Sequence, residues 1–149
     1  MPDDSHASVV AALERTVHRV LELLTAELAD LGLTQGEVNA LAQLDPRRGR
    51  TVAELQAATG QRASTLTGIV DRLERRGLVK RALNPRDRRS FRLTLTPEGK
   101  KARERVRRAF RDLDRRALAK VSDRSAKGFF ETLEALDALH DSRSNSTIS

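Results

Sequence analysis

The amino-acid sequence predicts a mainly α-helical protein that carries one small β-hairpin. Apolar residues recur every three or four positions over most of the chain, as in amphipathic helices. Two Thr-x-x-Glu helix starts occur close together, and one short segment alternates apolar and polar residues around a proline-containing turn. At 149 residues, the chain has the length of one ordinary domain and can bury a core.

Two helices are predicted in the first third of the chain. The first runs from about Ser8 to Asp30 and ends at Gly32, and the second begins at the capping box Thr34-Gln-Gly-Glu37. The first helix carries an apolar stripe of near-heptad spacing, which suits packing against other helices. The stripe consists of Val10, Leu13, Val17, Val20, Leu24, Leu28 and Leu31.

A helix-turn-helix is predicted over residues 51–77. Thr51-Val-Ala-Glu54 is a second capping box and opens a short helix that ends at Gly60. A further helix follows from Ala63 to Arg76, and Gly77 stops it. Its apolar face consists of Leu66, Ile69, Val70 and Leu73.

A basic β-hairpin is predicted directly after this motif, over residues 78–95. Asn84-Pro-Arg-Asp87 has strong turn chemistry because the proline fixes φ and the short polar side chains bond locally. A helix-turn-helix followed by such a wing places one helix in a DNA major groove, while the basic hairpin reaches the neighbouring backbone or minor groove. The apolar residues expected to face inward on the return strand are Phe91, Leu93 and Leu95.

Two more helices are predicted after the wing. Thr96-Pro97-Glu98 combines a cap, a proline at the first helical position and an acid near the positive end of the helix dipole. The long helix that it opens breaks at Ser122-Asp-Arg-Ser125, and a last helix leads into a Ser-rich tail, Asp141 to Ser149, which is expected to fray. The apolar side of the long helix comprises Val106, Phe110, Leu113, Ala117 and Val121, and that of the last helix Phe129, Phe130, Leu133, Leu136 and Leu139.

These elements predict a winged helix-turn-helix DNA-binding domain, residues 34–116, and a helical dimerisation region made of residues 1–33 and 117–149. The outer helices could simply complete the core of a monomer. A single helix-turn-helix offers few base contacts, however, and dimerisation doubles the binding site. We therefore expect a homodimer in which the amino- and carboxy-terminal helices of two chains interlock.

The distribution of charge supports binding to double-stranded DNA. Residues 45–116 hold 22 lysine and arginine residues against 9 acidic ones, a charge of +13, while the rest of the chain carries −6, which gives the net +7. Aromatic residues are scarce, so a stacking platform for single strands is not expected. The Arg-rich helix over residues 100–116 leaves open an alternative, an architectural protein that binds DNA without sequence preference.

Composition disfavours several other function classes. The sequence has no cysteine, which excludes disulfides, thiolate metal sites and thiol redox switches. No phosphate-binding glycine loop or plausible Ser/His/Asp arrangement suggests an enzyme. His18 and Glu22 could chelate a metal on one helix face, but two ligands do not form a zinc site, so neither metal nor cofactor is expected. No run could span a bilayer and the start Met1-Pro-Asp-Asp4 is not a signal peptide, so we expect a cytoplasmic protein.

The central motifs resemble those of the MarR family of bacterial transcription regulators. They are the segment Ala63 to Val79, which contains Val-Asp-Arg-Leu-Glu, the wing turn Asn84-Pro-Arg-Asp-Arg-Arg-Ser90, and Leu93-Thr-Leu-Thr-Pro-Glu-Gly99. The resemblance covers about Thr34 to Arg103, and the flanking helices match only in pattern. It implies a homodimeric winged helix that binds palindromic promoter sites, usually as a repressor that a small ligand releases.

The resemblance also implies roles for residues of the second, recognition helix. The short hydroxyls of Ser64, Thr65 and Thr67 are expected to reach base edges or phosphates. Arg72 would contribute a guanidinium, and Gly68 lies among these residues without a side chain of its own.

Residues before the recognition helix complete this part of the expected DNA site. The family often has Ser as the helix cap where this chain has Arg62, which removes a cap but adds a cation that could itself read DNA. Thr51 and the Arg47-Arg48-Gly-Arg50 cluster are expected to lie near phosphates.

In the wing, Asp87 and Arg89 match the family's Asp-x-Arg pair. Asp87 would orient Arg89 for the minor groove, where narrowing concentrates negative potential. Asp71 could pair with Arg75 one helical turn away or could brace the wing. Further backbone contacts are expected from Arg86 and Arg88.

A ligand site is the least specific part of the resemblance. In the family, small anionic aromatic compounds often bind between the dimerisation helices and the DNA-binding module. The polar residues that this chain offers there are Arg15, His18 and Arg19. The sequence does not identify an effector.

Overall fold

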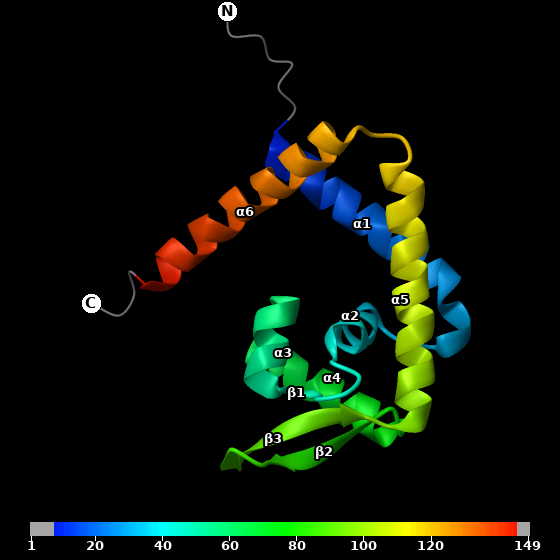
Figure 1. The fold of residues 1–149 in the computed structure, drawn as a ribbon, viewed down its shortest axis with the longest axis vertical. Coiled ribbons are helices and arrows are strands. Elements are labelled where there is room, and N and C mark those ends of the chain that lie inside the picture. Colours follow the sequence, from blue (N-terminus) through cyan, green and yellow to red (C-terminus); the bar gives the residue numbers. More distant parts are fainter. Residues whose placement is uncertain (1–7, 146–149) are drawn as a thin grey trace, which may run out of the picture. The chain divides into compact units, whose positions relative to one another are not determined.

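The computed structural model describes residues 8–145, with side chains as far as residue 142. The prediction of a mainly α-helical fold with a small wing is confirmed (Figure 1). The segment Met1-Pro-Asp-Asp4, which is not expected to be a signal peptide, lies outside the described residues, as does the end of the tail. The elements are α1 (Val9–Glu27), the 3-10 helix η1 (Ala29–Leu31), α2 (Gln35–Gln43), β1 (Arg50–Thr51), α3 (Val52–Thr59), α4 (Ala63–Arg75), β2 (Val79–Asn84), β3 (Asp87–Leu95), α5 (Pro97–Leu118) and α6 (Asp123–Asn145).

The described chain forms two compact units, residues 8–110 and residues 111–145. The first contains α1, the helix-turn-helix, the sheet and the beginning of α5, and the second contains the end of α5 and α6. Helix α1 thus clusters with the DNA-binding elements, whereas the sequence groups it with the last helices. The role of both chain ends in dimerisation stays a prediction. No helix within residues 8–145 is long and apolar enough to cross a membrane.

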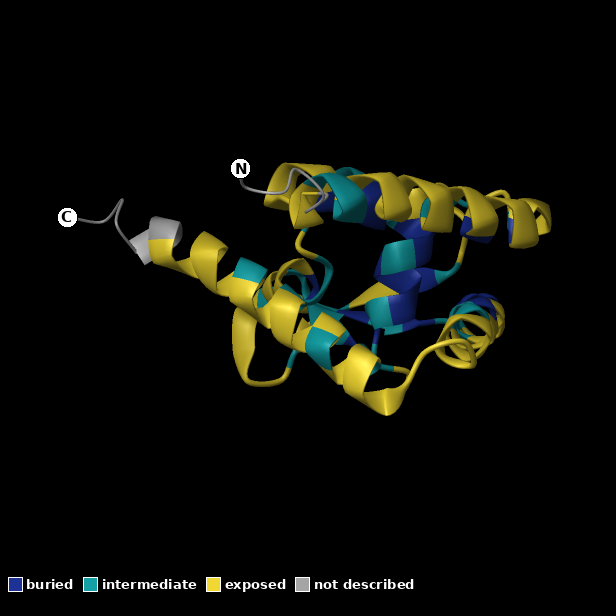
Figure 2. Ribbon diagram, turned by 90° about the horizontal axis from the view of Figure 1, so that it is seen from above, coloured by how far each residue is buried: buried dark blue, intermediate teal, exposed yellow. Residues whose placement is uncertain are grey.

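The core of the first unit lies among α2, α3, α4, the sheet and the first turns of α5. Figure 2 shows how the buried segments gather there, while α6 is exposed along most of its length. The apolar face predicted for α4 is confirmed, since all four of its residues are buried. The largest fully buried side chains are Leu41, Leu44, Leu55, Leu66, Ile69, Leu73, Leu93 and Val106.

The sheet has three antiparallel strands in the order β1-β3-β2. Strand β1 is absent from the sequence prediction, which treats Arg50 as part of a loop. Arg50 pairs with Leu93, and Thr51 with Arg92, so β1 joins the wing to the start of α3. Two residues are too short to show alternation in a sequence, so no pattern could have indicated this strand.

Both predicted capping boxes are present. The Thr34 hydroxyl accepts from the Glu37 backbone N–H at 3.3 Å, and the Glu37 carboxylate accepts from the Thr34 N–H at 3.0 Å. The same exchange joins Thr51 and Glu54, at 3.1 and 3.0 Å. These boxes fix the first residues of α2 and α3 because they satisfy amides that have no partner within the helix.

The first and last helices differ from their predicted bounds. Helix α1 ends at Glu27 and not at Asp30, because the chain tightens into η1, whose i+3 bonds occupy the last carbonyls. Helix α6 continues to Asn145, so the tail does not fray from Asp141 onward. Within it, the Ser142 hydroxyl donates to the Ala138 carbonyl at 2.8 Å, so this polar residue is accommodated in the helix.

Phe91 and Val121 are expected to face inward but are exposed. Phe91 lies on the inner face of the wing but beyond the edge of the core, and 50% of it is exposed. Val121 lies past the end of α5 at Leu118 and is also exposed. In both cases the periodic pattern continues after the packed element has ended.

Helix α5 is attached to the first unit by polar contacts along its first turns. The Thr96 hydroxyl accepts from the Gly99 N–H at 3.0 Å and lies 2.6 Å from the Gly77 carbonyl oxygen, to which it donates. Farther along, Arg103 donates to the Leu44 carbonyl at 2.7 Å. A two-point ion pair joins Arg105 to Asp30, and its hydrogen bond holds the pKa of the Asp30 carboxyl below the usual value.

Gly99 allows the start of α5 to pass close to the base of the wing. A Cβ atom at this position would lie 1.8 Å from the Leu78 carbonyl oxygen, so the backbone would have to move. Gly128 in α6 is a matched contrast, because a Cβ there would meet nothing within 4 Å.

We expect Gly99→Ala to lower the free energy of unfolding by about 1–3 kcal/mol, because the added methyl group overpacks a buried position. Gly128→Ala should instead leave stability unchanged or raise it by up to about 1 kcal/mol, since alanine is the better helix former. Urea denaturation of both variants checks this, and equal stability of the two would contradict the close approach at Leu78.

Candidate nucleic-acid interface

The amino-terminal end of α4 is exposed and can approach a ligand. Gly60 ends α3 with a φ of 69°, a left-handed conformation, and this turn sets the direction of α4. Arg62 occupies the N-cap position, and its side chain makes no capping bond, as the sequence predicts. Ser64 and Thr65 follow with exposed side chains. This end of α4 presents unpaired backbone amides and one cation, which suits a phosphate.

The hydroxyl groups expected at the interface are partly engaged within the chain. The Thr67 hydroxyl donates to the Ala63 carbonyl at 3.0 Å, which leaves its lone pairs outward. The Thr51 hydroxyl accepts the Glu54 N–H, which leaves its proton for another acceptor. Gly68 is half-buried, and a Cβ there would lie 3.4 Å from Nη1 of Arg72. The recognition helix therefore keeps a flat, polar surface at Thr67 and Gly68.

Arg72 is held by a buried carboxylate. Its Nε donates to Oε1 of Glu37 at 2.8 Å, and Glu37 is only 2% exposed. Arg76 lies 3.7 Å from the other carboxylate oxygen and also donates to the carbonyls of Leu31 and Gly32. Glu37 therefore joins α2, α4 and the junction after α1. The sequence predicts the capping role of Glu37 but not these ion pairs.

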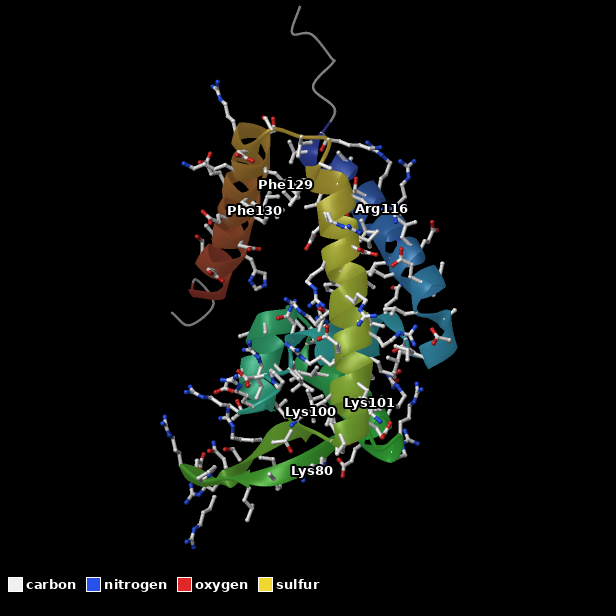
Figure 3. All side chains as sticks on the ribbon, turned by 45° about the vertical axis from the view of Figure 1, so that its right-hand side comes forward. Lys80, Lys100, Lys101, Arg116, Phe129 and Phe130 are labelled. Atoms are coloured by element: carbon white, nitrogen blue, oxygen red, sulfur yellow. The ribbon has the colours of Figure 1, made fainter. Side chains whose placement is uncertain are left out.

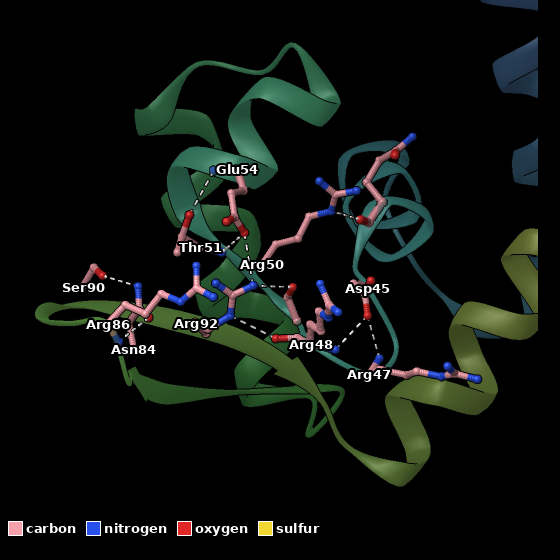
Figure 4. Close-up of polar contacts among 12 residues, drawn as sticks. Asp45, Arg47, Arg48, Arg50, Thr51, Glu54, Asn84, Arg86, Ser90 and Arg92 are labelled. Atoms are coloured by element: carbon pink, nitrogen blue, oxygen red, sulfur yellow. Dashed lines mark hydrogen bonds and ion pairs between the residues drawn. The ribbon is translucent and has the colours of Figure 1, made fainter.

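The basic loop before α3 divides into fixed and outward-facing arginines (Figure 4). Asp45 accepts the backbone N–H groups of Arg47 and Arg48 at 2.8 and 2.7 Å, and these bonds hold the pKa of its carboxyl below the usual value. Arg50 donates through Nε to the Gln43 carbonyl at the end of α2, so its role is structural. The side chains of Arg47 and Arg48 remain exposed. Of this cluster, these two are the ones placed to meet phosphates.

The turn of the wing is organised by short polar side chains. Asn84 accepts the Arg86 N–H at 3.1 Å and donates to the Ser90 hydroxyl at 3.0 Å. Asp87 accepts the backbone N–H of Arg89 at 3.0 Å. Asp87 thus positions Arg89 through its backbone, whereas the sequence prediction is that Asp87 orients the Arg89 side chain.

Three guanidinium groups project from this organised turn. Arg86, Arg88 and Arg89 are exposed, and among the described residues none of them forms an ion pair. Because the turn is fixed while the cations are not neutralised, the wing presents concentrated positive charge. Figure 3 places three lysines nearer the base of the hairpin, Lys80 on β2 and Lys100 and Lys101 on α5.

Two arginines that the sequence analysis does not single out fasten the wing to the helices. Arg81 on β2 pairs with both Asp71 and Glu74 of α4, which confirms that Asp71 braces the wing. Arg92 on β3 donates to the carbonyls of Arg48 and Gly49, at 3.0 Å each, and pairs with Glu54 of α3 at 3.3 Å. Strand alternation places Arg81 on the same face as buried Val79. A charged residue on an otherwise apolar face must have an acidic partner, and this is the sequence signal that could have indicated the ion pairs of Arg81.

A cavity of about 490 Å³ opens in the first unit beside α1 and α2. The described residues that line it carry no charge. Gln61 extends into this wall, and its Oε1 is buried with no hydrogen-bond partner among the described residues. Arg15, His18 and Arg19 are exposed on α1, but none of them lines the cavity. Its lining residues are Val17, Leu21, Leu24, Thr25, Gln35, Gly36, Val38, Asn39, Gln61 and Phe110.

Apolar side chains remain exposed on the helices outside the DNA-binding elements. In the second unit, Phe129 and Phe130 pack edge to face with ring centres 5.8 Å apart, yet both are more than half exposed (Figure 3). They line an apolar cavity of about 430 Å³ together with Leu118 and Val121. Of the seven residues in the predicted stripe at the amino terminus, three are exposed, two are half-buried and only Leu24 and Leu28 are buried; the exposed ones are Val10, Val17 and Val20.

Comparison with known proteins finds similarity to one family of regulators. The sequence model of the MarR family matches residues 31–90, which include α2, the helix-turn-helix and the wing turn. The crystal structure of CouR from Rhodococcus jostii RHA1 bound to p-coumaroyl-CoA superposes with a TM-score of 0.78 at 27% identity, over 89% of this chain and 95% of that one. Over its central residues the chain is similar to members of the MarR family.

Two curated transcriptional regulators match a shorter region. A putative transcriptional regulatory protein for the hcr operon of Thauera aromatica is 32% identical over 92 residues, or 62% of this chain and 55% of that protein. The transcriptional repressor MdtR of Bacillus subtilis is 27% identical over 97 residues, or 65% of this chain and 63% of that protein. The chain thus spans less than two thirds of their length. These relatives are named as regulators and not as enzymes, in agreement with the sequence prediction.

Removal of the buried charge tests the junction at Glu37. We expect Glu37→Gln to lower the free energy of unfolding by about 1–3 kcal/mol, because glutamine keeps the capping geometry but leaves Arg72 and Arg76 without their counter-ion. Glu54→Gln is the matched control, since Glu54 has the same capping position but is exposed, and it should cost under about 1 kcal/mol. Chemical denaturation distinguishes the two, and an equal loss would contradict a special role of Glu37.

Proposed function

We propose that this protein is a transcriptional regulator that binds duplex DNA at a specific site. The observation that carries the proposal is the fixed wing turn, whose three guanidinium groups have no ion-pair partner among the described residues. The turn lies in the same unit as an exposed recognition-helix terminus. Arg62, Ser64, Thr65 and Thr67 would meet the major groove and Arg89 the neighbouring minor groove. Such a regulator acts in the cytoplasm, where DNA is accessible.

The proposed assembly is a homodimer on a palindromic site, with half-sites about one helical turn apart. The exposed apolar residues of α1, α5 and α6 support it, because water would otherwise cover a large apolar surface. A second copy of the chain would bury these residues and place two recognition helices at a fixed separation. Repression is the proposed outcome, since a bound dimer excludes other proteins from a promoter.

The alternative, an architectural protein without sequence preference, draws on the Arg-rich helix α5. Several of these arginines are engaged within the chain, however. Arg103 bonds to Leu44, Arg105 to Asp30 and Arg115 to Asp112. Arginines that already have partners within the chain contribute less to binding the DNA backbone without sequence preference. This favours the site-specific regulator.

We propose that a small molecule releases the protein from DNA by occupying the cavity beside α1 and α2. Because its described lining is uncharged and includes the polar side chain of Gln61, the cavity suits a neutral compound that forms a hydrogen bond with this amide. This differs from the anionic aromatic ligands that the family resemblance suggests for Arg15, His18 and Arg19.

Selection of genomic fragments followed by titration tests DNA recognition. At ~150 mM salt we expect the best palindrome to bind about 10³-fold tighter than a scrambled duplex. Arg89→Ala should weaken this binding about tenfold or more, because it removes the minor-groove cation. Arg124→Ala, on exposed α6, is the control and should bind as the wild type does. Equal affinity for both duplexes would favour the architectural alternative.

Paired ligands test the cavity. Salicylamide and salicylate differ mainly in the charge and donor of one substituent, and we expect only the neutral amide to raise the melting temperature and weaken DNA binding. Gln61→Leu should abolish the response to salicylamide, whereas Gln56→Leu, on the exposed side of α3, should not. Tighter binding of salicylate would reject a neutral ligand site.

A further inference from the structure

The wing carries an exposed apolar pair near its far end. Leu83 on β2 and Phe91 on β3 are direct cross-strand partners, and they are 66% and 50% exposed. The hairpin extends beyond the helices that cover its base (Figure 1). Between Leu83 and Asn84 the register shifts, so the pair marks the last regular rung before the turn.

Strand alternation places the pair on the inner face of the wing. Leu83 lies two residues after Arg81, whose side chain pairs with α4, and four after buried Val79. Phe91 likewise lies two residues before buried Leu93. This face is apolar and covered at the base of the hairpin, and it continues as apolar but uncovered surface at Leu83 and Phe91.

The surroundings of the pair favour a polyanionic partner. The next residues toward the tip include Arg86, Arg88 and Arg89, none of which has an ion-pair partner among the described residues. A protein surface that covered the pair would have to neutralise this charge with acidic groups. Duplex DNA offers negative charge for the arginines and apolar surface for the pair, because its phosphates are anionic and its deoxyribose edges are apolar.

We propose that Leu83 and Phe91 form an apolar contact with the deoxyribose edges of duplex DNA beside the groove that Arg89 enters. The proposal rests on the DNA-binding function proposed above. Because the pair lies on the flat face of the hairpin and not in its turn, it packs along the sugar wall and does not wedge between bases. The contact adds affinity without neutralising a phosphate.

The two kinds of wing contact have different salt signatures. A cation that enters the minor groove or neutralises a phosphate displaces counter-ions from the DNA, so its removal lowers the slope of log affinity against log salt, by about one for a phosphate contact. An apolar side chain releases no counter-ion. Loss of Phe91 should therefore weaken binding equally at all salt concentrations, whereas loss of Arg89 should weaken it most at low salt.

The test is titration of the selected duplex by fluorescence anisotropy from ~0.1 to ~0.3 M salt, with the full-length protein. We expect Phe91→Thr and Leu83→Thr each to weaken binding about tenfold with an unchanged salt slope. Threonine keeps the strand propensity of the site. Phe91→Leu, which keeps apolar surface, should stay within about twofold of the wild type, and Arg89→Ala should lower the slope.

Any other result contradicts the proposed contact with DNA, and the alternative explanations can be told apart. Wild-type affinity of both threonine variants would reject the contact and leave the DNA-binding proposal standing. A wild-type protein that binds no duplex would reject both. If sedimentation shows that Phe91→Thr disrupts a dimer, the pair is an interface between copies. Should Phe91→Thr lose its thermal unfolding transition, the more exposed Leu83→Thr decides.

Discussion

The buried carboxylate of Glu37 constrains more of the first unit than any other single group. It caps the start of α2 through Thr34, holds Arg72 of the recognition helix and attracts Arg76, which reaches the carbonyls after α1. A carboxylate that is 2% exposed is tolerable only when its hydrogen bonds are made, so each partner is required by the others. The orientation of α4 relative to α2 follows from this requirement and not from apolar packing alone.

The wing depends on a second set of charges that act in the same way. Arg81 ties β2 to α4, and Arg92 ties β3 to α3 and to the loop before β1. Because these arginines have partners inside the chain, they fix the base of the hairpin. The arginines of the turn have none among the described residues and remain available to an anion. The division between structural and binding cations is therefore set by position along the hairpin.

Much of this architecture can be predicted from local sequence signals. Thr34, Thr51 and Thr96 mark helix starts because capping involves residues only three apart, and Gly60 marks a stop for the same local reason. The partners of Glu37, the strand at Arg50 and the acids that hold Arg81 depend on residues distant in sequence. No periodicity reports such contacts, although a charged residue on an apolar face indicates that one must exist.

Gln61 connects the cavity to the start of the recognition helix. Gln61 lines the cavity and directly precedes Arg62, the N-cap of α4. A ligand bonded to the Gln61 amide would therefore act beside the backbone at the point where α4 begins. Coupling between two binding sites is reciprocal. If the ligand lowers the affinity for DNA by some factor, bound DNA lowers the affinity for the ligand by the same factor. Promoter-bound dimers would then respond only at higher effector concentrations than free ones, and the threshold of induction would depend on how strong the operator is.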